Sequence, residues 1–131
     1  HSADEAIIVV TPHVSSIRDA DKVLSILSTY SLTTKSIVVN RVRGDLLLSG
    51  EMISVEKIAE LLHTKILGVI PDDDDVSTLS TLGAFSSGSS GARAFSILAE
   101  NVHNGSKKVY DCTQRYRGLV GMIRRNIKRK V

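Results

Sequence analysis

The chain has 131 residues, enough for one ordinary domain, and 42% of them are hydrophobic although only 4% are aromatic. A single cysteine excludes an intramolecular disulfide, and no apolar run approaches the ~18 residues that a membrane-spanning helix needs. Charge is uneven: residues 106–131 contain nine Lys or Arg and one Asp, whereas residues 1–105 contain eight basic and thirteen acidic residues. A basic end on an acidic body is typical of a segment that meets a polyanion, either nucleic acid or an anionic membrane.

Three short apolar runs follow in chain order, at 6–10, 37–39 and 66–70, and the strands that contain them are expected at 6–11, 36–42 and 66–70. They lack the alternation of a half-exposed strand, so they predict strands buried on both faces, as in parallel sheets. The stretches between them have helical spacing, and strand, helix, strand units imply right-handed crossovers. The predicted fold class is therefore α/β, a parallel sheet with flanking helices.

Two helices are predicted between these strands. Either Ser15 or Ser16 can cap the first helix, and Ser54 can cap the second after a loop at 44–53 that has room for one helical turn. The buried face of the first helix is expected to contain Ile17, Ala20, Val23 or Leu24, and Leu27, and that of the second Val55, Ile58, Leu61 and Leu62.

The third run leads into Pro71 and four consecutive aspartates at 72–75. Parallel strands deliver such residues to the carboxyl edge of the sheet, where open α/β sheets bind ligands. Three interpretations are open: a solvated loop that caps a following helix, a Mg²⁺ site, and a wall for a bound base formed by the backbone of Pro71, Asp72 and Asp73. Consecutive carboxylates splay apart and have no spaced partners here, so no metal ligand is assigned.

The region after the acidic run is expected to contain a short helix at 76–82 and a Ser/Gly-rich loop at 83–91, with room for a strand at 84–85. Helical spacing returns at 92–102 through Phe95, Leu98 and Ala99, and the residues at 104–106 predict a helix stop. The predicted organisation is an α/β unit at 1–103, a linker at 104–115 and a separate helix at 116–131.

Residues 116–131 predict an amphipathic helix that suits the plane of a membrane interface. We expect Gly118 and Gly121 to weaken it, so that it orders only on binding. A solubilising basic end, a partner-docking helix and non-specific nucleic-acid binding are the alternatives, and a plain basic end would not need apolar residues spaced to one face. One half of the wheel holds Tyr116, Leu119, Val120, Met122, Ile123, Ile127 and Val131, and the other holds Arg117, Arg124, Arg125 and Lys128.

Phosphate-binding and hydrolase motifs are missing from the sequence, namely G-x-x-x-x-G-K-[ST], G-x-G-x-x-G and G-x-S-x-G. Without a phosphate cradle, we do not expect the chain by itself to hydrolyse a nucleotide. Cys112 has no evident base beside it and is interpreted as an ordinary thiol.

Four ordered motifs, TPHVSSIRDADKV, NRVRGD, SGEMISVEKIAELL and ILGVIPDDDDV, closely resemble the carboxyl-terminal half of the MinD family. These septum-site-determining ATPases are part of the deviant Walker A group, which also includes the ParA partition ATPases. The resemblance runs from about residue 4 to residue 95, and the basic tail stands where the family carries a membrane-targeting helix. The family's phosphate loop, switch regions and catalytic Mg²⁺ site have no counterpart in this sequence.

By this resemblance Asn40 would contact the adenine edge of ATP, with Arg41 beside it, and Pro71, Asp72 and Asp73 would wall the base. ATP with Mg²⁺ would be the cofactor of the complete protein. The surface that the family shares between its partners MinC and MinE corresponds to Ser15, Arg18, Asp19 and Asp21. The membrane-binding residues would be Leu119, Val120, Met122, Ile123, Ile127, Arg124, Arg125 and Lys128.

The resemblance implies a fragment of a cell-division site-selection ATPase that dimerises, attaches reversibly to the membrane and recruits MinC-type and MinE-type partners. It would work in the cytoplasm at the inner membrane, or in the stroma of a plastid. A ParA-like fragment that binds DNA and a non-enzymatic partner-binding module are the alternatives. The sequence departs from the family at His13, where Glu is common, at 80–85, where Asn-x-Gly-Glu-Pro is usual, and in a tail without Phe, which predicts weaker insertion.

Overall fold

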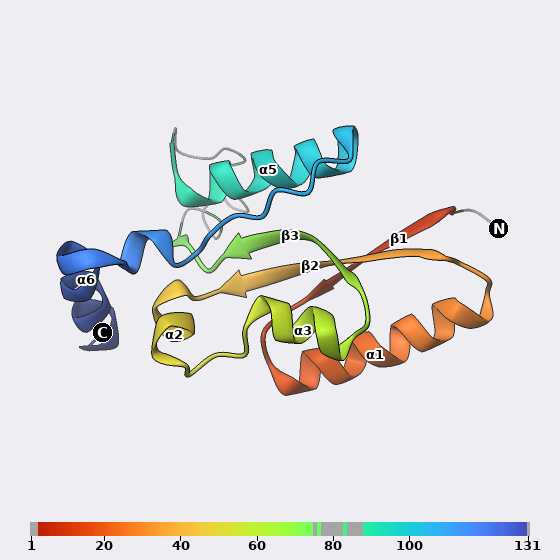
Figure 1. Ribbon diagram of the computed structural model, residues 1–131, viewed down its shortest axis with the longest axis horizontal. Coiled ribbons are helices and arrows are strands. Elements are labelled where there is room, and N and C mark those ends of the chain that lie inside the picture. Colours follow the sequence, from red (N-terminus) through yellow and green to blue (C-terminus); the bar gives the residue numbers. More distant parts are fainter. Residues whose placement is uncertain (1–2, 75, 77–82, 84–87, 131) are drawn as a thin grey trace.

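The computed structural model of the chain describes residues 3–74, 76, 83 and 88–130, which form an α/β arrangement (Figure 1). The elements in chain order are β1 (Glu5–Val10), α1 (Val14–Thr29), β2 (Thr34–Val42), α2 (Gly44–Ser49), α3 (Val55–Leu61), β3 (Lys65–Pro71), α5 (Ser90–Asn104), the 3₁₀ helix η1 (Gln114–Tyr116) and α6 (Gly118–Lys130). The helical turn expected within 44–53 is α2.

The three strands form one parallel sheet in the order β1-β2-β3. Helices α1 and α3 lie on one side of this sheet, and α5 lies on the other (Figure 1). The larger apolar cluster, which includes the fully buried Ile37 and Ile58, fills the space under α1 and α3. A smaller cluster of Val38, Ile70 and Ala94 lies under α5. The predicted α/β fold with a parallel sheet and flanking helices is thus confirmed.

The first strand is not buried on both faces, so that expectation was wrong. Ile7 is 49% and Val9 63% exposed, whereas Val10 is buried. Helix α5 packs against β3, two strands away, and therefore leaves this face of β1 uncovered. A run of apolar residues predicts that a strand forms. Which faces of that strand are covered depends on helices that are distant in the sequence.

The caps of the two crossover helices differ in how well they were predicted. His13 occupies the N-cap of α1 without a side-chain bond, and Ser16 Oγ instead accepts from the Thr11 N–H at 3.0 Å, so the proposed Ser15 or Ser16 cap was wrong. The turn after β1 is short enough that α1 already begins at Val14. Ser54 caps α3 as predicted, because its side chain accepts from the Lys57 N–H.

The buried helix faces are mostly those predicted from spacing. Leu24 rather than Val23 is buried in α1. In α3 the prediction holds for Val55, Ile58 and Leu62 but is wrong for Leu61, which is 50% exposed. In α5 Ala99 is exposed, and Ala94 is buried together with Ser90 and Gly91 at the start of the helix. The helix expected at 76–82 and the strand expected at 84–85 lie mainly outside the described residues.

Helix α5 starts at Ser90, two residues before the predicted start, because Ser89 accepts from the Ala92 N–H and caps it. It stops as predicted at Gly105, whose φ of 66° is the left-handed conformation that favours glycine. Its close approach to β3 depends on Gly68, where a Cβ would lie 2.8 Å from Leu98 Cδ1.

Residues 106–117, which we call the returning segment, run from the end of α5 toward α6 (Figure 1). Asn101 on α5 ties this segment to the sheet: its Nδ2 donates to the Leu67 carbonyl at 2.7 Å and to the Lys108 carbonyl at 2.6 Å. Cys112 is buried in the larger cluster, and Tyr110 packs against both clusters. The stretch expected as a linker therefore makes specific contacts with the α/β unit.

Candidate functional site

The carboxyl ends of β2 and β3 form an irregular edge at the predicted base site. The strand register shifts between Val39 and Val42, and Val42 is paired with the buried Pro71. Asn40 and Arg41 lie in this irregularity, where Arg41 has a φ of +59° and Asn40 Oδ1 accepts from the Arg41 N–H at 2.9 Å. A non-glycine residue in the left-handed region is uncommon, and such strain concentrates at functional sites.

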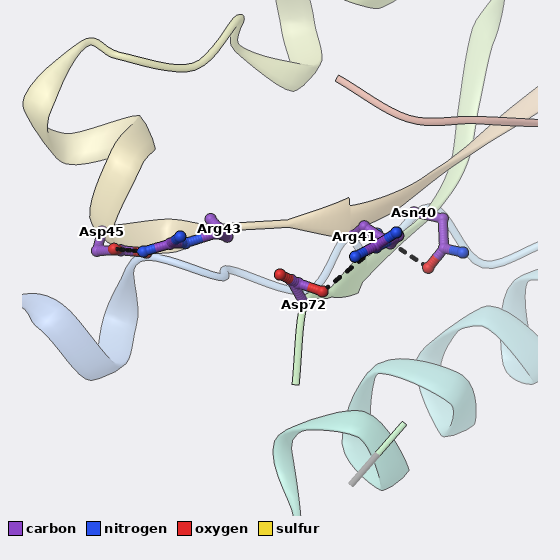
Figure 2. Close-up of polar contacts among 5 residues, drawn as sticks. All are labelled: Asn40, Arg41, Arg43, Asp45 and Asp72. Atoms are coloured by element: carbon purple, nitrogen blue, oxygen red, sulfur yellow. Dashed lines mark hydrogen bonds and ion pairs between the residues drawn. The ribbon is translucent and has the colours of Figure 1, made fainter. Parts of the chain in front are cut away.

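Figure 2 shows that side chains from the two strand ends meet. Arg41 Nε lies 3.5 Å from Asp72 Oδ1, and the Asp72 N–H donates to the Val42 carbonyl at 3.0 Å. The Arg41 and Asp72 side chains are 70% and 36% exposed, so solvent screens this ion pair. The structure thus places Arg41 against Asp72, with Asn40 beside Arg41 and Pro71 before Asp72, at the carboxyl edge of the sheet where the sequence places the acidic run.

Asp73 faces a partner that sequence spacing could not reveal. Arg115 Nη1, from the returning segment, lies 3.3 Å from Asp73 Oδ2 and donates to the buried Ser90 Oγ at 2.9 Å. The two ion-paired residues are 42 positions apart. The basic composition of the carboxyl-terminal segment was the one available signal, and it does not identify Arg115 among nine cations.

Arg43 makes the most buried ion pair of the described residues at this edge. Its guanidinium donates to both carboxylate oxygens of Asp45, at 3.2 and 2.5 Å, and Asp45 is only 3% exposed (Figure 2). The hydrogen bond to Asp45, followed by the carboxylate's charge, raises the pKa of Arg43 above its usual value, although partial burial opposes the shift. This bidentate pair fixes the start of α2 next to the site.

A cavity of about 220 Å³ opens at the same edge. Pro71, Asp72 and Asp73 line one part of it, and Tyr110, Arg115 and Tyr116 of the returning segment line another, whereas Asn40 and Arg41 are not part of its lining. We call it the base-side cavity. Cys112 also borders it, but burial and the nearby Asp111 charge raise the pKa of this thiol to about 12. A thiol that stays protonated is a poor nucleophile, in agreement with the interpretation of Cys112 as an ordinary thiol.

The described residues of this edge do not form a ready metal site. The carboxylates of Asp72 and Asp73 face guanidinium groups, and their backbones follow the end of β3. Among residues 3–74, 76, 83 and 88–130, no group of three or more His, Cys, Asp or Glu side chains is placed to hold a metal ion. The carboxylates therefore act here in ion pairs.

The predicted partner residues lie on a separate surface. Ser15, Arg18, Asp19 and Asp21 are all exposed along α1, and Asp19 pairs with Lys22 at 3.5 Å. Helix α1, which carries them, lies on the side of the sheet opposite α5 (Figure 1).

Helix α6 leaves its apolar residues in solvent. Leu119 is 82% exposed, Ile123 62% and Ile127 60%, and Val120 and Met122 are at least half exposed. Arg124 and Arg125 lie on the same helix, whereas the side chain of Lys128 is outside what the structure describes. None of the helices within the described residues is long and apolar enough to cross a bilayer. Tyr116, assigned to this helix from the sequence, lies before it in η1.

No protein-family model matches the chain. The septum site-determining protein MinD of Synechocystis is 43% identical over 74 residues, which is 56% of this chain and 28% of that protein. A chloroplastic MinD homologue of Arabidopsis thaliana is 40% identical over 74 residues, 56% of this chain and 23% of that protein. The matched segment thus spans about a quarter of the length of these relatives.

Solved structures give the same result. The MinC:MinD cell division protein complex of Aquifex aeolicus matches with a TM-score of 0.74 at 33% identity, over 79% of this chain and 44% of that one. The MinD of Pyrococcus horikoshii complexed with Mg-ADP matches with a TM-score of 0.66 at 30% identity, over 78% of this chain and 42% of that one. In sequence and in fold, the chain is therefore similar to a part of MinD, which confirms the resemblance recognised in its motifs.

Proposed function

We propose that the chain is the base-side part of a MinD-like cell-division ATPase and carries its reversible membrane anchor. The observation that carries the proposal is α6, which holds five apolar side chains in solvent beside cationic ones. Apolar residues exposed in one short helix are costly unless a partner surface covers them. An anionic membrane matches both the apolar and the cationic residues.

The nucleotide part of the proposal rests on the carboxyl edge. Asn40 and Arg41 would contact the adenine, and Pro71, Asp72 and Asp73 would wall it, since the two strand ends bring them together. Mg²⁺ would supply charge neutralisation for the phosphates. The paired carboxylates of Asp72 and Asp73 do not suit Mg²⁺, so its ligands and the phosphate loop would come from outside these 131 residues. A MinD relative complexed with Mg-ADP supports this assignment.

The partner part of the proposal rests on α1. Its exposed residues Ser15, Arg18, Asp19 and Asp21 would contact a MinC-type protein, and the matched MinC:MinD complex supports such a partner. A MinE-type partner and a homodimer are proposed for the complete protein on family resemblance. Two anchors in a dimer would raise membrane avidity by orders of magnitude. The chloroplastic relative supports a plastid location as one setting.

Co-sedimentation with liposomes tests the anchor. The whole chain is compared with a chain that stops after Arg117, which removes α6 but keeps the buried Cys112. We expect only the whole chain to pellet, and only with anionic lipid, because each Lys or Arg near an anionic leaflet contributes about 1 kcal/mol.

A point substitution sharpens the test. Ile123→Asp places a charge on the exposed apolar side of α6, whereas Val102→Asp places one on a similarly exposed site of α5. Loss of pelleting with the first and not the second supports an inserted helix. Equal pelleting of all forms, or binding to DNA with no lipid preference, would contradict the anchor and favour the ParA-like alternative.

A further inference from the structure

The base-side cavity is completed by residues that the predicted base site does not include. The predicted wall of Pro71, Asp72 and Asp73 follows β3, but Tyr110 and Tyr116 of the returning segment also line the cavity. These two residues are 39 to 45 positions away from Pro71 along the chain. A ligand that enters the cavity therefore meets both parts of the molecule.

The lining of the cavity suits a base better than a phosphate. Three carboxylates, those of Asp72, Asp73 and Asp74, would repel an anion but can accept from an exocyclic amine. Of the two guanidinium groups in the lining, that of Arg115 is already held by Asp73 and by Ser90. The aromatic rings and the buried proline offer flat apolar faces, which are what a base needs for stacking.

Tyr116 is held in place from two sides by glycines. A Cβ on Gly44 would lie 3.0 Å from Tyr116 Cδ2, so the ring sits directly on the start of α2. A Cβ on Gly121 would lie 2.2 Å from the Tyr116 carbonyl carbon, so the first turns of α6 press on its backbone. Because both contacts fix the residue before any ligand arrives, little conformational entropy is lost when a ligand binds.

We propose that Tyr116 is a further base-contacting residue, and that its ring stacks on a purine that lies in the base-side cavity beside Pro71. This assignment rests on the proposed nucleotide site and adds to it a contact from the carboxyl-terminal segment. The short 3₁₀ helix η1, which precedes α6 and contains Tyr116, thereby becomes part of the base site.

Adenosine binding by the full chain, measured by calorimetry or ligand-observed NMR, tests the assignment. Tyr116→Ala should weaken binding by about fivefold or more, as loss of one stacking face does, and Tyr116→Phe should stay close to the wild type. Tyr116→Leu keeps apolar bulk against Gly44 and should still weaken binding, which separates stacking from packing. Tyr30→Ala, at an exposed tyrosine that follows the last residue of α1, is the matched control and should change nothing.

The outcomes separate the two proposals. If the wild-type chain does not bind adenosine, the base site of the proposed function fails and Tyr116 with it. If the wild type binds and the Ala and Leu variants bind equally well, only the role of Tyr116 is overturned. Competitive displacement of adenosine by inorganic tripolyphosphate would show an anion site in the cavity and would also overturn the assignment.

Discussion

Gly44 and Cys112 touch backbone to backbone: a Cβ on Gly44 would lie 1.9 Å from the Cys112 carbonyl oxygen. The contact joins the first residue of α2 to the returning segment at Cys112, a residue that is only 6% exposed. It is therefore one of the points where the carboxyl-terminal segment is held against the carboxyl edge of the sheet.

Gly44→Ala should push the returning segment away from α2. Because a backbone atom blocks the new methyl group, we expect the free energy of unfolding in urea to fall by about 1–3 kcal/mol. The Cys112 thiol should also react faster with a disulfide reagent. Ser49→Ala, at an exposed site on the same helix, should change stability by no more than about 0.5 kcal/mol. Unchanged stability and thiol reactivity in Gly44→Ala would show that this contact does not hold the segment.

The raised pKa of Cys112 predicts a pH dependence of stability. Burial, followed by the charge of Asp111, raises the pKa of the folded thiol to about 12, against an ordinary value of 9.0. The unfolded thiol ionises first as pH rises, so its contribution to stability is complete below about pH 9 and is lost between about pH 9 and 12. Urea unfolding at pH 10 should show a loss of about 1.4 kcal/mol relative to pH 8 that Cys112→Ala lacks. If the free energy of unfolding of the wild type and of Cys112→Ala changed in the same way with pH, the raised pKa of Cys112 would be contradicted.

The two Arg–Asp pairs of Figure 2 should differ in their effect on stability. Arg43→Ala removes a bidentate guanidinium from the buried carboxylate of Asp45, and we expect a loss of about 3 kcal/mol, the lower end for buried pairs because Arg43 is 29% exposed. Arg41→Ala, from the exposed pair with Asp72, should cost less than about 1 kcal/mol.

The double substitution Arg43→Ala/Asp45→Asn provides the control for charge. It replaces the buried carboxylate by a neutral amide and should recover part of the stability that Arg43→Ala loses. Equal losses for Arg43→Ala and Arg41→Ala in chemical unfolding would mean that burial of Asp45 does not matter.

Local sequence patterns predicted the features that depend on local physics. Apolar runs predicted the strands, Ser54 predicted the start of α3, and Gly105 predicted the end of α5. Each of these features depends on residues within one helical turn or one strand. The exposure of Val9 could not be predicted, because α5 packs on β3 and not on β1.

The candidate site was predictable to the same extent. Arg41 lies near the carboxyl end of β2 and Asp72 follows β3, and parallel strands bring their ends to one edge, so their proximity follows from the fold class. The approach of Arg115 to Asp73 has no such rule, since it depends on the path of the returning segment. That path is set by tertiary contacts of Asn101 and Cys112, which no periodicity encodes.

Substitution of Asn101 should detach the returning segment from the sheet. Asn101 is 4% exposed, and its Nδ2 donates both to the Leu67 carbonyl of β3 and to the Lys108 carbonyl of the returning segment. Asn101→Asp keeps the shape but, when ionised, cannot donate and directs negative charge at two carbonyl oxygens. We expect a loss of about 1–3 kcal/mol for each donated bond and faster hydrogen exchange at 106–110.

The pH dependence of Asn101→Asp distinguishes lost donation from lost packing. A carboxyl buried between two carbonyls is disfavoured in its charged form, so its pKa in the folded chain should be raised above that of the unfolded chain. Relative to the wild type, the variant should therefore be least stable near neutral pH and should recover as the carboxyl is protonated on acidification. Asn104→Asp, exposed at the end of the same helix, should lose less than about 1 kcal/mol and should leave exchange at 106–110 unchanged. If Asn101→Asp is equally destabilised at neutral and acidic pH, packing and not the two hydrogen bonds accounts for its effect.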